Sequence, residues 1–136
     1  MGTSMKHELT SLRLISSRPS FTAEVIAGGS VLVNLHKELE KYAFDSKIHE
    51  GQLVVRPLVL PTVRAIVSFK PRCPIFRVDG IHEEYGPMHG GWEIPCTFEH
   101  GRFVPAPKPG YEGYNLESLL ESYLSNTLEG LICEFM

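Results

Sequence analysis

The segment around His100-Gly101 constrains the fold of this 136-residue chain more than any other. Apolar and polar side chains alternate before it, which is typical of a strand with one buried face. Glycine at the second position of a two-residue loop suits a type I′ turn, so a tight antiparallel hairpin is predicted. The cross-strand pairs that would result, both favourable, are Phe98 with Phe103 and Glu99 with Arg102.

Two longer runs of β-branched residues also predict strands. Residues 52–60 and 62–70 are separated by Pro61 and should pair in an antiparallel manner. Pro57 lies inside the first run and predicts a sheet edge or a bulge there, because proline cannot donate a ladder hydrogen bond. Shorter strand patterns cover residues 9–16, 21–25 and 75–78. A glycine turn at residues 27–30 is expected to follow the second of these, and Asp79-Gly80 is expected to close the third.

Apolar residues at helical spacing predict two helices. Ser30 is a suitable N-cap for a helix at about residues 31–44, although residues 31–35 could instead extend a strand. Asn115 should cap a second helix at about 116–129, which Gly130 should end. Few strands are separated by helices. The expected fold class is therefore α+β, with a mainly antiparallel curved sheet of five to seven short strands and these two helices.

Size and composition predict one domain. Residues 1–4 resemble a short added leader before a native Met5, which leaves 5–136 as a single α+β domain. The three cysteines show no C-x-x-C spacing, so reduced thiols and a cytoplasmic location are expected. No apolar run approaches the roughly 20 residues that span a bilayer, and no membrane association is predicted.

Charge is distributed in opposed blocks along the chain. Residues 1–50 carry six acids and six bases, residues 51–78 carry five bases and no acid, and residues 79–136 carry ten acids and two bases. Unlike blocks attract, so the basic block should dock on the acidic one, within a chain or across a homodimer. The segment lacks the exposed aromatic residues that usually accompany the bases of nucleic-acid proteins, so no nucleic-acid partner is predicted.

Residues capable of chemistry are concentrated between positions 82 and 100, which hold three of the six histidines. The catalytic candidates are His82, Glu84 and His89, because imidazole titrates near neutral pH and a carboxylate can orient it. The candidate ligand-binding residues are Trp92, Tyr85, Arg77 and Arg64, of which the two arginines would favour a small anionic ligand. Metal-ligand spacing such as H-E-x-x-H is missing, so we predict neither a metal nor a cofactor.

Two functional hypotheses follow from these observations. The first is a small non-enzymatic binding or interaction module that self-associates as a dimer. The alternative is a small-molecule-binding protein or metal-dependent enzyme that uses the His/Glu/Trp segment 82–100, with His82 or His89 as general base. The loop-and-hairpin character of that segment favours the first hypothesis over an enzyme.

Overall fold

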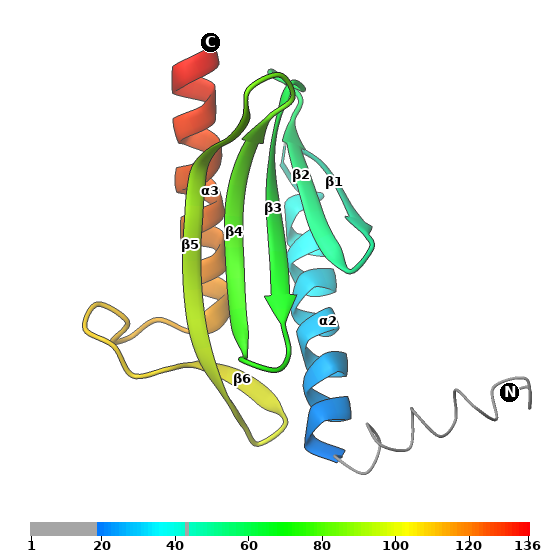
Figure 1. Cartoon of the computed structure of the whole chain (residues 1–136), viewed down its shortest axis with the longest axis vertical. Helices are drawn as coiled ribbons and strands as arrows, with labels where there is room; N and C mark the ends of the chain where they lie inside the picture. The colour runs from blue at the N-terminus through cyan, green and yellow to red at the C-terminus, as the bar shows by residue number, and fades with distance from the viewer. Residues whose placement is uncertain (1–18, 43) are drawn as a thin grey trace, which may run out of the picture.

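The computed structural model describes residues 19–42 and 44–136. It contains six antiparallel strands that follow one another in the sheet in chain order, with a helix before and a helix after them (Figure 1). The elements are α2 (Pro19–Leu39), β1 (Phe44–His49), β2 (Gln52–Pro57), β3 (Val63–Lys70), β4 (Ile75–His82), β5 (Gly86–Glu99), β6 (Arg102–Pro105) and α3 (Leu116–Phe135). The predicted α+β class with a curved antiparallel sheet is confirmed. The predicted strand at residues 9–16 lies outside the described residues.

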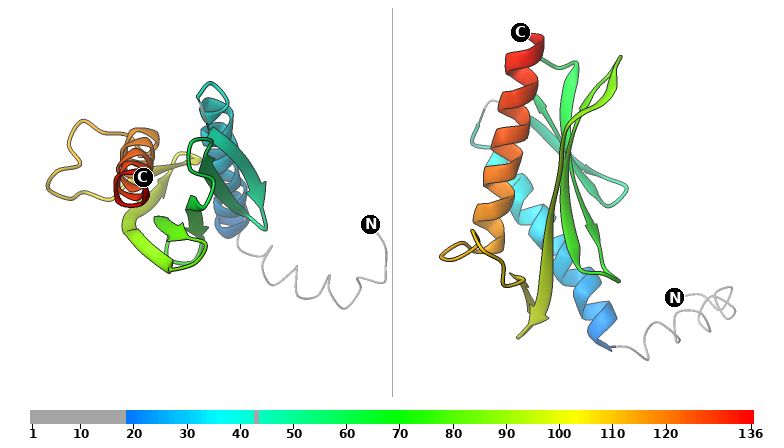
Figure 2. Two further views of the ribbon diagram at one scale, coloured as in Figure 1. Left: turned by 90° about the horizontal axis from the view of Figure 1, so that it is seen from above. Right: turned by 60° about the vertical axis from the view of Figure 1, so that its left-hand side comes forward.

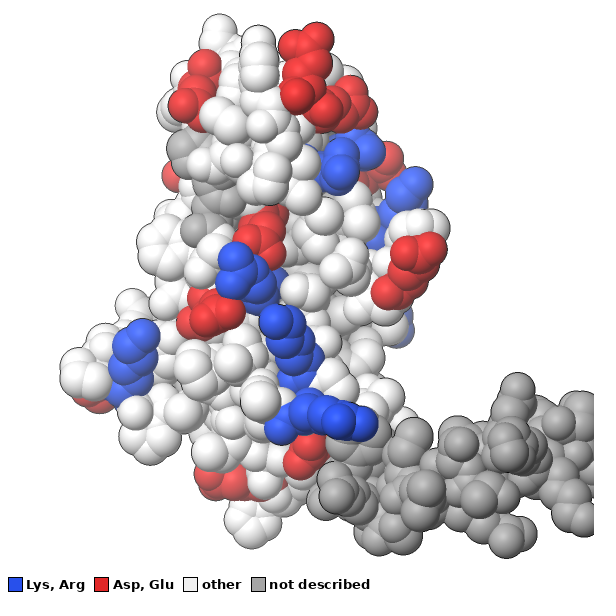
Figure 3. All heavy atoms as spheres, in the orientation of Figure 1, with Lys and Arg blue, Asp and Glu red and all other residues white. Residues whose placement is uncertain are grey.

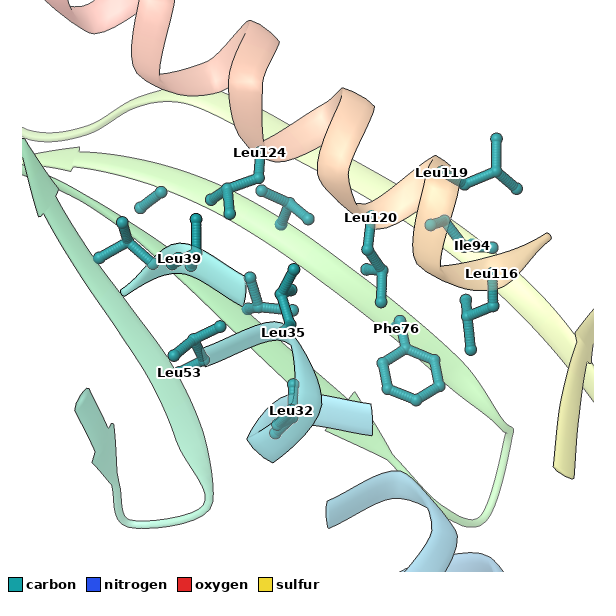
Figure 4. Packing of buried hydrophobic residues seen from close by; sticks show 14 of the residues in the cluster. Leu32, Leu35, Leu39, Leu53, Phe76, Ile94, Leu116, Leu119, Leu120 and Leu124 are labelled. Atoms are coloured by element: carbon teal, nitrogen blue, oxygen red, sulfur yellow. The ribbon is translucent and has the colours of Figure 1, made fainter. Parts of the chain in front are cut away.

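Both helices cover the same face of the sheet, and no helix of the described residues lies on the opposite face (Figure 2). Leucines of α2 and α3 point toward the strands and meet their inward-facing side chains (Figure 4). Buried and half-buried residues alternate strictly along β4, as expected for a strand with one covered face. The side chains at the centre of the core include Leu32, Leu35, Leu53, Phe76, Ile94, Leu120 and Leu124.

The predicted hairpin is confirmed. Phe98 pairs with Phe103 and Glu99 with Arg102 in the register of β5 and β6. His100 and Gly101 both have positive φ angles, 53° and 79°, as the predicted turn type requires. The hairpin places Phe103 inside the core, where its ring lies 4.9 Å from that of Phe69.

The predicted pairing of the strands on either side of Pro61 is also confirmed, since β2 and β3 run antiparallel. The prediction of an edge or bulge at Pro57 is wrong. β2 lies between β1 and β3, and Pro57 is simply its last residue, beyond the register that pairs β2 with β3. The prediction that Asp79-Gly80 closes a strand is also wrong, because β4 continues to His82 with Gly80 buried inside it.

The N-terminal helix is longer and begins earlier than the sequence indicated. The predicted strand at 21–25 and glycine turn that follows it are both part of α2, and the helix ends at Leu39 rather than near 44. Residues 31–35 are therefore helical. Glycine is required at position 28 of the helix because a Cβ atom there would collide with the ring of Phe69. This packing requirement outweighs the poor helix propensity of glycine.

The C-terminal helix begins as predicted and ends later. Asn115 is the N-cap, and its side-chain oxygen accepts a hydrogen bond of 2.8 Å from the backbone N–H of Ser118. The prediction that Gly130 ends the helix is wrong, because α3 continues to Phe135. The apolar stripe of α3 also continues past Gly130, since Leu131 is fully buried. The gain from burying these last residues offsets the cost of one glycine.

Candidate functional site

The imidazole of His82 is held in a packed aromatic cluster. Its ring lies 4.8 Å from the ring of Tyr85 and 4.2 Å from that of Phe135. His82 is 8% exposed, and its Nδ1 atom accepts a hydrogen bond of 3.0 Å from the backbone N–H of Glu84. In the neutral ring this bond places the proton on Nε2. The structure thus gives His82 a packing and turn-forming position at the end of β4.

Tyr85 is a candidate whose side chain contacts this imidazole, whereas the ring of Trp92 packs elsewhere. Glu84 and Tyr85 are exposed in the turn between β4 and β5, with Tyr85 against His82. The backbone of His89 pairs with Gly80 in the sheet. Trp92 stacks on Tyr123 of α3, with ring centroids 4.9 Å apart and an interplanar angle of 8°. Each aromatic residue therefore has a packing partner in the fold.

The two candidate arginines lie on the other side of the sheet from His82. In the register of β3 and β4, Arg64 pairs with Ile81 and Arg77 pairs with Ser68. Alternate residues of a strand point to opposite faces of the sheet, and both arginines point to the face opposite His82. Arg77 donates to both carboxylate oxygens of Asp79 and, at 2.9 Å, to Glu93. These two carboxylates raise the pKa of Arg77, with the hydrogen bonds to Asp79 as the largest cause. The predicted ligand-binding residues are thus divided between the two faces of the sheet.

Basic side chains form a row across the uncovered face of the sheet, with acidic side chains beside them (Figure 3). Three ion pairs there join the basic block of the sequence to the acidic block: Arg56 with Glu83 at 3.3 Å, Arg77 with Asp79 at 2.9 Å and Arg77 with Glu93 at 2.9 Å. Part of the charge attraction inferred from the sequence is therefore satisfied within one chain.

The described residues offer little to a metal ion. Among the side chains that the structure describes, no three of His, Cys, Asp or Glu lie together as a ligand set. Cys96 is buried, and its thiol donates to the carbonyl oxygen of Ile94 at 3.4 Å. Burial and, to a lesser degree, the Glu117 carboxylate raise the pKa of this thiol to about 12, which makes it unreactive near neutral pH.

Three surface hollows lie elsewhere, beside α2. One of about 690 Å³ is bounded by α2, the β5–β6 hairpin and the start of α3, and another of about 510 Å³ lies between α2 and the β1–β2 turn. A third, of about 440 Å³, separates the end of α2 from α3. None of these three is lined by His82, Tyr85 or Trp92. Helix α2 therefore stands as a ridge between the first two hollows.

The solvent-facing side of α2 is unusual in composition. Residues 25–36 include no Asp, Glu, Lys or Arg, and Val25, Ile26 and Val33 are exposed. The outer side of α3, in contrast, carries the exposed acids Glu117, Glu121 and Glu129. An amphipathic helix that covers a core normally carries charge on its outer side, as α3 does. The sequence pattern predicts a strand and a turn within residues 21–30, so it does not indicate a helix surface there.

Comparisons with family models, with curated proteins and with solved structures found no match. Within the described ranges, neither helix combines the length and apolarity that crossing a membrane requires.

Proposed function

We propose that this protein is a small, non-enzymatic interaction module that binds other protein surfaces and self-associates. The observation that supports the proposal is the uncharged, partly apolar outer side of α2 over residues 25–36. Exposed apolar residues that occur singly are normal, but a contiguous group on a helix flanked by hollows is typical of a protein-binding surface. The three ion pairs on the sheet leave less of the basic block available to drive association by charge.

The enzyme hypothesis gains nothing from the described geometry. A general base must reach the proton that it abstracts and must have a cavity beside it for substrate. His82 instead lies among aromatic rings, with its Nδ1 atom bonded to the main chain. In the hollow beside the hairpin, the exposed Arg102 would attract a small anionic ligand, but the exposed Glu117 on the same wall would oppose it.

We further propose that the module works in the cytoplasm. All three cysteines are free thiols, and two of them, Cys73 and Cys133, are exposed. Exposed free thiols suit a reducing compartment, in which they are not oxidised to mixed disulfides.

The test of the function is the mass of the protein in solution. We expect analytical ultracentrifugation of the full chain, over a wide concentration range, to show a reversible monomer–dimer equilibrium. An apolar interface should persist when the salt concentration is raised from 50 mM to about 1 M, where surface charges are screened within about 3 Å. A protein that remains monomeric at every concentration and salt level would contradict the proposal of self-association.

A further inference from the structure

Gly28 and Gly29 are consecutive in α2, but their surroundings differ. A Cβ atom at Gly28 would collide with the ring of Phe69, so that glycine is required by the contact of the helix with the sheet. A Cβ atom at Gly29 would meet nothing within 4 Å. Glycine in a helix interior costs about 1 kcal/mol relative to alanine. Within the described chain nothing compensates for this cost at Gly29, whereas a second helix that approached closely would do so.

The residues around Gly29 form a surface of regular shape. Ile26, Ser30 and Val33 follow at helical spacing on the outer side of α2, and all three are exposed. Large side chains thus lie on either side of the small pair Gly29-Ser30. The hollows on the two flanks share Ile26, Ser30 and Asn34 as their common wall. The same surface therefore presents a ridge and, directly beside it, grooves that could receive a ridge.

We propose, on the basis of the self-association proposed above, that two copies of this chain dimerise through an antiparallel contact of their α2 helices, centred on Gly29 and Ser30. A two-fold axis at this point places Ile26 of each copy opposite Val33 of the other. Such an interface uses the same patch on both copies, so the patch must be self-complementary. In the proposed dimer the larger Ile26 meets the smaller Val33 at each end of the contact, and the small residues Gly29 and Ser30 meet where the two helices cross.

The charge pattern also favours a second copy over a different partner. A two-fold contact brings each charge near its own duplicate, so charged residues near the axis would repel. Between Glu24 and Lys37, α2 carries no lysine, arginine or acid, so the residues next to the proposed axis are uncharged. Small residues at the crossing allow the two helix axes to approach to about 8 Å, the lower end of the usual range. The first turns of α2 extend past the turn between β3 and β4 (Figure 2).

The first experiment compares two matched charge substitutions by analytical ultracentrifugation of the full chain. Ile26 is 65% exposed on α2 and Leu58 is 62% exposed in the turn between β2 and β3, so neither change should disturb the core. We expect Ile26→Glu to weaken the dimer at least about tenfold, because it removes a buried isoleucine from the interface, and Leu58→Glu to leave it unchanged. Adding Val33→Lys to Ile26→Glu should recover part of the affinity, since the antiparallel contact places the two new charges opposite each other.

The second experiment locates the axis. In a chain with Cys73→Ser and Cys133→Ser, Ser30→Cys should give a disulfide-linked dimer on mild oxidation, whereas Ser122→Cys, an exposed control on α3, should not. Gly29→Leu should also weaken the dimer, although it adds apolar surface, because it blocks the close approach. A dimer that tolerates Ile26→Glu and Gly29→Leu and gives no Ser30→Cys link would overturn this interface and leave self-association standing. A chain that never dimerises would overturn both proposals.

Discussion

The ring of Phe135, next to the last residue of the chain, lies 4.2 Å from the imidazole of His82 at the end of β4. This contact joins the end of α3 to the turn between β4 and β5, where Tyr85 adds a third ring. The histidine that the sequence offered as a catalytic base is thereby part of the packing of the C-terminal helix against the sheet.

We therefore expect Phe135→Ala to destabilise the fold by about 1–2 kcal/mol, less than the cost at a fully buried phenylalanine because the site is only half-buried. Urea denaturation followed by circular dichroism measures the change. Met136→Ala is the control, because Met136 is 75% exposed and should contribute nothing. Equal stability of the two variants would mean that the end of α3 does not hold the His82 cluster.

A second prediction concerns the contact between α2 and the sheet. Gly28→Ala should cost about 1–3 kcal/mol, because the new methyl group collides with Phe69, whereas Gly29→Ala should stabilise the monomer by up to about 1 kcal/mol. Thermal unfolding at concentrations low enough to keep the protein monomeric gives both values. Combining Gly28→Ala with Phe69→Leu should recover part of the loss, since a more flexible side chain can move aside. Similar effects of the two glycine substitutions would contradict the different positions of the two residues.

The sequence predicted those parts of the fold that depend on local patterns. The hairpin at His100-Gly101 follows from residue alternation and turn chemistry, and Asn115 is a local capping signal. The wrong predictions of where helices and strands end share a different cause. Gly28, Gly80 and Gly130 each suggested the end of an element, and each lies inside one because a tertiary contact or buried neighbours favour continuation. Local propensity is a weak guide where packing decides.

The candidate site illustrates a second limit of sequence reasoning. The histidines and acids of the 82–100 segment are close in sequence, but alternate residues of a strand point to opposite faces of the sheet. The parity that places His82 inside also places Arg77 and Arg64 outside, and this could be read only once the strand boundaries were known. The α2 surface was missed for the same reason, since its residues form one face only in a helix.

A third prediction tests the charge network on the uncovered face of the sheet. Arg77→Gln should cost less than about 1 kcal/mol at low salt, because Arg77 is 37% exposed and its pairs with Asp79 and Glu93 are screened by water. The loss should nearly disappear at about 1 M salt, where the two carboxylates left behind no longer repel strongly. Arg64→Gln is the control, since no acidic side chain pairs with Arg64 within the described ranges. Chemical denaturation with urea, which adds no charge, measures both.

The last prediction concerns stability at high pH. The folded protein retains the proton of the buried Cys96 thiol up to about pH 12, whereas the unfolded chain releases it near the ordinary thiol pKa of about 8.5. The folded state therefore binds more protons between these values, so the free energy of unfolding should fall as the pH rises through this window. Tyr111, whose pKa is raised to about 12 chiefly by burial, adds to the fall above about pH 10.

We expect Cys96→Ser to flatten the pH dependence of urea unfolding between about pH 8.5 and 10, because a serine hydroxyl does not ionise there. Iodoacetamide should label the exposed Cys73 and Cys133 but not Cys96 in the native protein, which provides an independent check of burial. An unchanged slope in Cys96→Ser would show that this thiol does not control the alkaline loss of stability.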